Sequence, residues 1–131
     1  MLRQQVKFYW SIEVPEKVKK EGIAKGGEYA QTEFVREVQM CLKAPLSGKA
    51  DSITLGKTVT VSSKKNKKHA VVYPVQKFFK KIGIYFNTCD RSCGAGTTAA
   101  IDKYQKDVLM YQKQDGEITA RQKMWKSLLK V

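Results

Sequence analysis

The chain has 131 residues, of which 42% are hydrophobic and 10% aromatic, and a formal net charge of +13. This length fits one compact domain spanning residues 1–131, and the aromatic content argues against a disordered chain. Nine glycines and three prolines exclude collagen-like and proline- and glycine-rich repetitive chains.

The first predicted element is a strand over residues 6–14, where large apolar residues alternate with polar ones until Pro15. A polar, glycine-containing stretch follows. Residues 28–43 then carry apolar residues near helical spacing, which favours a helix that ends before Pro45. A strand over 33–42 is the alternative, because the apolar residues there also partly alternate.

Residues 52–73 read as a β-hairpin with a basic tip. The strands are 52–62 and 70–73, and the tip at 63–68 holds four lysines around the turn-forming Asn66. Pro74 then opens a short helical turn over 75–81, and residues 82–87 return to a strand pattern.

Two helices are predicted to complete the chain. The first begins at Thr97 or Thr98 and runs to about residue 114, and the second covers 117–129, so the two form a helical hairpin. We detect no internal repeat. The sequence therefore predicts an α+β fold with a small, mostly antiparallel sheet and a C-terminal pair of helices.

The basic charge is concentrated in the middle of the sequence. Residues 38–89 contain ten lysines and one acidic residue, whereas 1–37 contain seven basic and six acidic residues, and 90–131 contain eight and five. Seven lysines fall within 64–81 with no acidic residue among them, namely Lys64, Lys65, Lys67, Lys68, Lys77, Lys80 and Lys81. This run predicts a polyanion-binding surface, with a merely solvated loop tip as the alternative.

Aromatic residues lie among these lysines, and we single out Tyr73 and Phe78 as candidates for stacking on unpaired bases. The alternative is that these rings belong to the core. The chain has 21 lysines and four arginines, and lysine suits nonspecific attraction better than base-edge reading. We therefore expect low sequence specificity.

Other patterns carry weaker indications. Cys89 and Cys93 are four residues apart and are expected to be thiols rather than a redox pair or, with Cys41 and His69, metal ligands. The glycine-rich stretch at 94–98 is expected to be a plain helix start, with a phosphate contact as the alternative. The apolar face of the last helix is expected to pack on the core rather than on a partner. We predict no metal, no cofactor and no enzymatic activity.

No run of about 18 apolar residues is present, so no transmembrane helix is predicted. The N-terminal residues lack a signal-peptide layout, and we expect a cytoplasmic or organelle-matrix location. Together these features predict a small, basic, non-enzymatic protein that binds nucleic acid or a ribonucleoprotein. The alternative is a basic linker or adaptor subunit that holds acidic proteins together in a large assembly, such as a light-harvesting antenna or a viral assembly.

Overall fold

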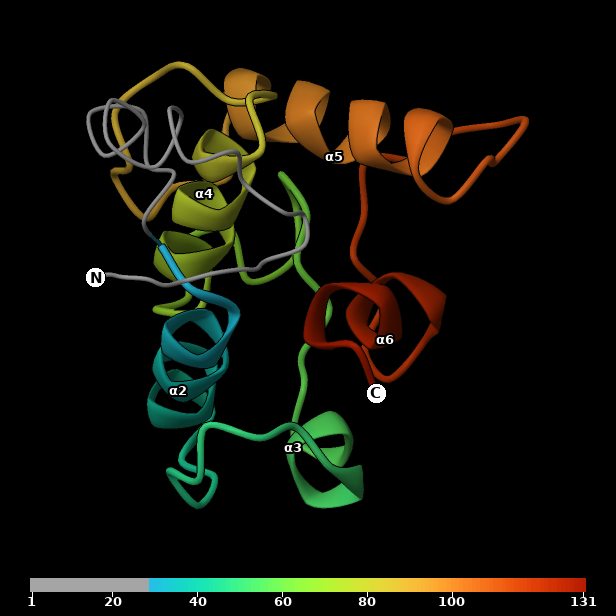
Figure 1. The fold of residues 1–131 in the computed structure, drawn as a ribbon. Coiled ribbons are helices and arrows are strands. Elements are labelled where there is room, and N and C mark those ends of the chain that lie inside the picture. The colour runs from blue at the N-terminus through green and yellow to red at the C-terminus, as the bar shows by residue number, and fades with distance from the viewer. Residues whose placement is uncertain (1–28) are drawn as a thin grey trace, which may run out of the picture.

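The computed structural model describes residues 29–131, whose regular secondary structure is helical. The helices are α2 (Gln31–Leu42), α3 (Ser52–Gly56), α4 (Val72–Lys81), α5 (Ala95–Asp107) and α6 (Lys123–Leu129). In Figure 1, α4 lies above α2 on one side of the molecule, α5 runs across the top, and α3 and α6 occupy the other side. None of these helices has the length and apolar character needed to cross a bilayer.

Helices α2 and α4 each bury one stripe of residues. In α2 the buried apolar residues recur at steps of three and four, and are Phe34, Val35, Val38 and Leu42. The helix begins after Ala30, whose backbone N–H donates to the Glu33 carboxylate over 3.3 Å. It ends at Lys43, which adopts the left-handed conformation with φ of 61°.

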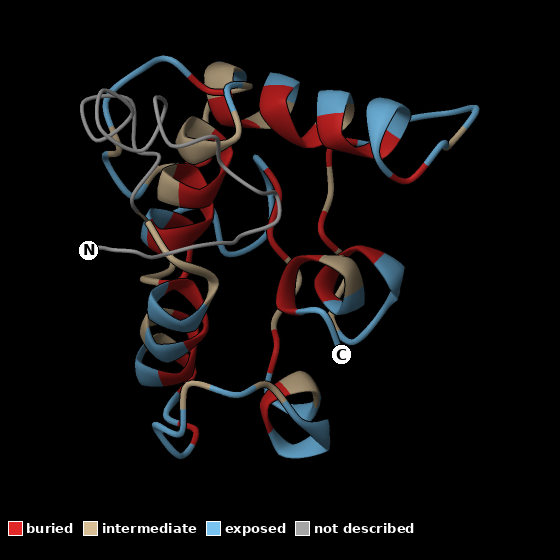
Figure 2. Cartoon of the chain, viewed as in Figure 1, coloured by how far each residue is buried: buried red, intermediate tan, exposed pale blue. Residues whose placement is uncertain are grey.

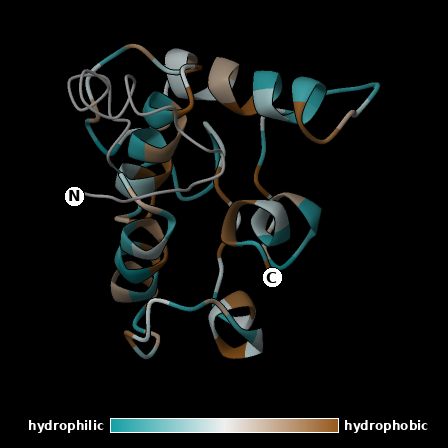
Figure 3. Cartoon of the chain, in the orientation of Figure 1, coloured by the Kyte–Doolittle hydropathy of each residue, from teal (hydrophilic) through white to brown (hydrophobic). Residues whose placement is uncertain are grey.

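The core between the helices is rich in aromatic rings. Phe34 packs on Phe78 with ring centroids 4.8 Å apart, and Phe79 packs on Tyr104 at 5.8 Å. Trp125 of α6 is fully buried, and its indole N–H donates to the carbonyl of residue 59 over 2.8 Å. Figures 2 and 3 show that buried and hydrophobic residues line the inward faces of the helices. Burial of each large apolar side chain contributes about 1.5–3 kcal/mol.

Three fully buried glutamines hold the loops that follow their helices: Gln39 on α2, Gln76 on α4 and Gln105 on α5. Their side-chain oxygens accept hydrogen bonds from the backbone N–H groups of Gly48 (2.9 Å), Arg91 (2.9 Å) and Asp115 (3.0 Å), respectively. A buried amide left without partners costs roughly 1–3 kcal/mol, so these contacts fix the loops firmly. We call each such arrangement a glutamine latch.

The α+β fold expected from the sequence is wrong, because no strand or sheet forms within residues 29–131. The predicted hairpin over 52–73 instead begins with α3 and ends with the first turn of α4. Asp51 explains the start of α3, because its carboxylate accepts the Thr54 N–H over 2.9 Å as a helix cap. This local cap outweighs the β-branched residues that suggested a strand.

Residues 58–61 are partnered by the segment 118–121 and not by a hairpin strand. Val61 and Ile118 exchange two backbone hydrogen bonds, at 3.0 and 2.9 Å, as a single antiparallel bridge. The hydroxyl oxygens of Thr58 and Thr60 accept backbone N–H groups from the same segment. The threonine pattern here reflects this contact between distant parts of the chain, and not a pair of neighbouring strands.

The other secondary-structure predictions are partly confirmed and partly wrong. The helix expected over 28–43 is present as α2, and the strand alternative there is wrong. The strand expected over 82–87 is a loop, in which Ile84 N–H donates back to Phe79 over 3.0 Å. The two C-terminal helices are shorter than predicted and are separated by residues 108–122. The strand predicted over 6–14 lies outside the described residues.

Candidate functional site

Four of the predicted lysines lie together on residues 63–69, which we call the basic loop. Lys64, Lys65, Lys67 and Lys68 are all exposed. The loop is nonetheless well ordered at its base. The Ser62 hydroxyl accepts the N–H groups of Lys64 (3.1 Å) and Lys65 (2.9 Å), and Asn66 takes a left-handed conformation with φ of 53°. The charges therefore project from a fixed turn.

A backbone hydrogen bond ties the basic loop to a second loop, formed by residues 89–94. Cys93 N–H donates to the carbonyl of Lys67 over 2.8 Å. Arg91 of this second loop is exposed, and its positive charge adds to burial in lowering the pKa of His69. Arg91 is two residues from Cys93, which is bonded to Lys67, so it adjoins the basic loop and is a cation of this surface that the sequence analysis missed.

The remaining predicted residues lie on α4 in different surroundings. Lys77 pairs with Glu37 at 3.0 Å, and its ammonium lies over the rings of Tyr29 (4.6 Å) and Tyr73 (5.0 Å). Phe78 is buried against the core rings, so it presents no face for stacking on a base. Lys80 and Lys81 are partly buried, and Lys81 lies over Phe78 at 6.0 Å.

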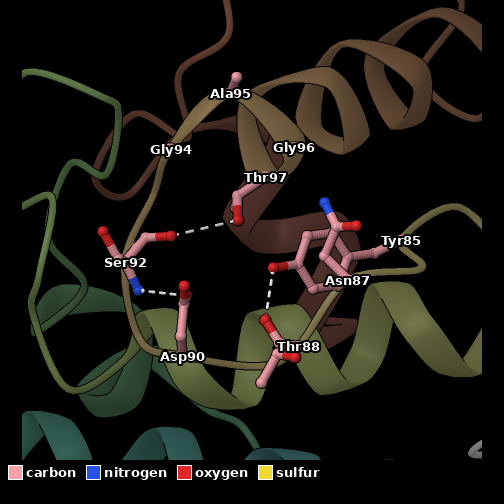
Figure 4. A pocket seen from close by; sticks show the side chains of 9 residues that line it. All are labelled: Tyr85, Asn87, Thr88, Asp90, Ser92, Gly94, Ala95, Gly96 and Thr97. Atoms are coloured by element: carbon pink, nitrogen blue, oxygen red, sulfur yellow. Dashed lines mark hydrogen bonds between the residues drawn. The ribbon is translucent and has the colours of Figure 1, made fainter.

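A pocket of about 360 Å³ adjoins the loop 89–94, at the beginning of α5. Its lining combines hydroxyl, amide and carboxylate side chains with small residues, namely Tyr85, Asn87, Thr88, Asp90, Ser92, Gly94, Ala95, Gly96 and Thr97. Figure 4 shows the Asp90 carboxylate and the Tyr85 hydroxyl pointing into it. The lining of the pocket is therefore mainly polar and offers many hydrogen-bonding groups.

The latch of Gln76 holds most of these groups in place. Its side-chain nitrogen lies within 2.9–3.2 Å of four oxygens, those of Tyr85, Asp90, Ser92 and Thr97. The Tyr85 hydroxyl donates to the carbonyl of Thr88 over 2.7 Å. Because these contacts are buried or partly buried, the lining is preorganised before a ligand arrives.

Asn87 lies against Gly96 at the edge of the pocket. A Cβ atom at position 96 would clash with the Asn87 side-chain nitrogen, so the Asn87 amide can take this position only when residue 96 is a glycine. The Asn87 side chain is exposed and makes no hydrogen bond to any residue in 29–131. Its donor and acceptor are therefore available to a ligand.

The charge inside the pocket is negative. Hydrogen bonds from Gln76 and from the Ser92 N–H hold the pKa of Asp90 below its usual range, so this carboxylate is ionised at neutral pH. Burial raises the pKa of Tyr85, which stays a neutral hydroxyl. No lysine or arginine is among the lining residues. This chemistry favours a ligand rich in hydroxyl or amide groups over a phosphate in the pocket itself.

The cysteines are free thiols, and burial raises the pKa of each. Cys93 is fully buried, and no three metal-binding side chains of residues 29–131 are grouped to hold an ion. The Nδ1 atom of His69 accepts the Val71 N–H over 3.0 Å, so one ring nitrogen is already engaged.

Two further sequence features can now be placed. The glycine-rich start of α5 forms one wall of the pocket, and its first N–H groups have no side-chain cap. The apolar residues of α6 all lie in the core, and are Met124, Trp125, Leu128 and Leu129. The expected packing of α6 on the protein's own core is therefore what the structure has.

The sequence analysis did not predict the pocket. Its lining residues are short polar side chains of ordinary loop composition, and a buried glutamine on another helix brings them together. The position of Gln76 directly after Val75, on the buried stripe of a helix, is a sequence feature that indicates a buried role for Gln76.

Comparison with known proteins gives no relative from which to transfer a function. No family model matches the chain, no curated protein resembles it significantly, and no solved structure does so either.

Proposed function

We propose that this chain is a non-catalytic binding module for an anionic glycan, meaning a polysaccharide whose units carry carboxylate or phosphate groups. One observation carries the proposal. A polar pocket suited to hydroxyl groups and a cluster of exposed cations lie on two loops joined by the bond from Cys93 to Lys67. A polymer bound across both loops meets hydrogen-bonding groups and positive charge together.

The pocket supports the glycan part of the proposal. Sugar hydroxyls both donate and accept, and they match a lining of hydroxyl, amide and ionised carboxylate groups held in fixed positions. Phe86 lies between two lining residues and is 81% exposed, which offers a flat apolar face to the C–H side of a sugar ring.

The basic loop supports the anionic part. Its four exposed lysines and Arg91 carry charge that attracts a polyanion over roughly a Debye length, about 8 Å at physiological salt. The Asp90 carboxylate faces the pocket, so the anionic groups of the polymer belong outside it, over the basic loop. The two parts of the ligand thus bind at different places.

Nucleic acid and acidic protein partners, expected from the sequence, stay predictions. A nucleic acid suits the basic loop but uses the pocket poorly, because an ionised carboxylate lines it and Phe78 is buried. The adaptor hypothesis needs an acidic protein over the same lysines. Both alternatives are outcomes of the experiment below.

The experiment is co-sedimentation of the full chain with purified bacterial cell-wall sacculi, insoluble glycans whose attached peptides carry carboxylate groups. Chitin serves as the neutral glycan, and mobility shifts with single-stranded RNA and duplex DNA serve as the nucleic-acid arm. We expect retention on sacculi that survives nuclease treatment and exceeds retention on chitin. Binding to RNA or DNA alone overturns the glycan proposal in favour of nucleic acid. Binding to neither polymer class overturns both the glycan proposal and the nucleic-acid prediction and leaves the adaptor hypothesis.

A further inference from the structure

The three glutamine latches reveal an internal structural repeat that sequence similarity does not show. In the second unit, Gln76 Nε2 donates to Asp90 Oδ1 (3.1 Å) and to the carbonyl of Ser92 (3.1 Å). In the third, Gln105 Nε2 donates to Asp115 Oδ1 (2.8 Å) and to the carbonyl of Glu117 (2.9 Å). In both, the aspartate oxygen also accepts an N–H from two residues later, at 3.0 Å.

The first unit repeats this pattern with a serine. Gln39 Nε2 donates to the Ser47 hydroxyl and to the carbonyl of Lys49, both over 3.3 Å, and Ser47 accepts the Lys49 N–H over 3.2 Å. The middle residue of each triplet is left-handed, with φ of 76° at Gly48, 63° at Arg91 and 65° at Gly116. The latch and its turn therefore recur after α2, α4 and α5.

This repeat separates the structural from the functional residues of the pocket. The side chains of Tyr85, Asp90 and Thr97 contact the latch glutamine, and Ser92 does so through its backbone carbonyl, so these contacts are explained by folding. Asn87 takes no part in the latch, and neither does its neighbour Phe86, whose ring is largely exposed. In the third unit the corresponding connection is 108–114, which follows the end of α5 (Figure 1) and in which the Tyr111 N–H donates to the Gln105 carbonyl over 2.8 Å.

We infer that Asn87 is the residue that determines which glycan the pocket accepts, with Gly96 providing the space that Asn87 occupies and Phe86 the adjoining stacking face. This inference rests on the proposed function and assigns its specificity. The Asn87 amide offers one acceptor and two N–H donors at the rim of the pocket, where the hydroxyls of Thr88 and Ser92 also take no hydrogen bond within residues 29–131. A sugar unit that presents both a donor and an acceptor to the Asn87 amide gains two hydrogen bonds. A sugar unit that presents neither group gains none.

The test is retention of N87A, F86A and G96A on sacculi and on chitin, each with a thermal melt, because a residue that determines specificity changes the ratio between the two glycans. We expect N87A and F86A to weaken binding by about 3- to 10-fold, as for the loss of one or two hydrogen bonds or one ring contact, with unchanged melting temperatures. Gln112→Ala is the matched control, because Gln112 is an exposed amide in the connection 108–114 of the third unit.

G96A is the sharpest variant, because it separates folding from binding. Alanine favours the helix over glycine, so the melting temperature should hold or rise. Its Cβ displaces the Asn87 amide, so affinity should fall as in N87A. Wild-type binding with all three variants unchanged overturns the inference and leaves the proposed function standing. If the wild-type chain binds no glycan, both are overturned. Loss of binding in Q112A to the same degree also overturns the inference.

Discussion

The N–H of Cys93 donates to the carbonyl of Lys67 over 2.8 Å, and this bond joins two loops that are 26 positions apart in the sequence. It places the lysines of the basic loop beside the wall of the polar pocket. Cys93 itself is fully buried, so the join is protected from water and its geometry is fixed. The electrostatic and hydrogen-bonding parts of the candidate site are thereby one rigid surface.

Reversal of the charge on the basic loop should weaken binding in a salt-dependent way. We expect K64E/K65E/K67E/K68E to reduce the slope of log affinity against log salt by about 0.7–0.9 for each ion pair removed, on the order of 3 in total for a densely charged polymer. The measurement is binding across a salt series. The matched control reverses four exposed lysines on other elements: Lys49, Lys106, Lys113 and Lys126. Equal weakening in both variants would mean that net charge alone drives binding.

Removal of the second latch should destabilise the whole fold. Gln76→Leu removes the oxygen that accepts the Arg91 N–H and the two N–H donors that serve the oxygens of Tyr85, Asp90, Ser92 and Thr97. The Arg91 N–H is left without its partner, and each of the four oxygens loses one of its hydrogen bonds. Each unpartnered group costs about 1–3 kcal/mol, so we expect a decrease of roughly 2–4 kcal/mol in the free energy of unfolding. Urea denaturation measures it. A decrease below about 0.5 kcal/mol would contradict the latch, because that is the smallest net contribution expected of a single hydrogen bond. Q112A provides the surface-glutamine reference.

The pattern of correct and wrong expectations follows from where the determining contacts lie. Helix α2 was predictable, because its apolar stripe repeats locally from Phe34 to Leu42. The partners of residues 58–61 could not be predicted, because they lie 57 or more positions away in the sequence. An alternating pattern shows which residues share a face but not which distant segment they contact. Asp51 indicates the start of α3, but the sequence analysis did not identify it as a helix cap.

The same difference between local and distant contacts explains which parts of the candidate site could be predicted. Lysine spacing placed seven cations in one predicted surface, but Lys77 meets Glu37, 40 positions earlier in the chain. The latch glutamines resemble solvent-facing helix residues by composition. Each of them directly follows a buried apolar residue, namely Val38, Val75 and Tyr104. That shared position is a local signal for the structural repeat, and the Ser-Gly and Asp-Gly pairs at 47–48 and 115–116 are another.

Acid should expose the contribution of Asp90 to stability. The pKa of Asp90 is lowered in the folded state, first by the hydrogen bond from Gln76 and then by the Ser92 N–H. Its contribution is therefore present above the ordinary aspartate pKa, near 3.9, and is lost as the pH falls through the lower folded value. We expect the difference in stability between wild type and Asp90→Asn to shrink between about pH 5 and pH 2. A difference that is constant across this range would mean that the carboxylate charge contributes nothing.

Trp125 should be a principal anchor of α6. Trp125→Phe keeps an aromatic ring but removes the indole N–H that donates to residue 59 over 2.8 Å, and it leaves a small void in a fully buried site. The missing hydrogen bond and the imperfect packing together predict a decrease of about 2–4 kcal/mol in the free energy of unfolding. Urea denaturation is the measurement, and K126A on the exposed side of the same helix is the control. Similar stability of both variants would contradict the contact with residue 59.

Thiol labelling should distinguish the three cysteines in the native protein. Cys93 is fully buried and its pKa is raised by that burial, whereas Cys41 and Cys89 are partly exposed. A reagent that needs the thiolate should therefore modify Cys41 and Cys89 slowly and Cys93 only when the protein unfolds. Peptide mapping after timed labelling, with and without urea, measures the order. Rapid native labelling of Cys93 would show that the join between the basic loop and the pocket opens in solution, and the two parts of the site would then not form a fixed surface.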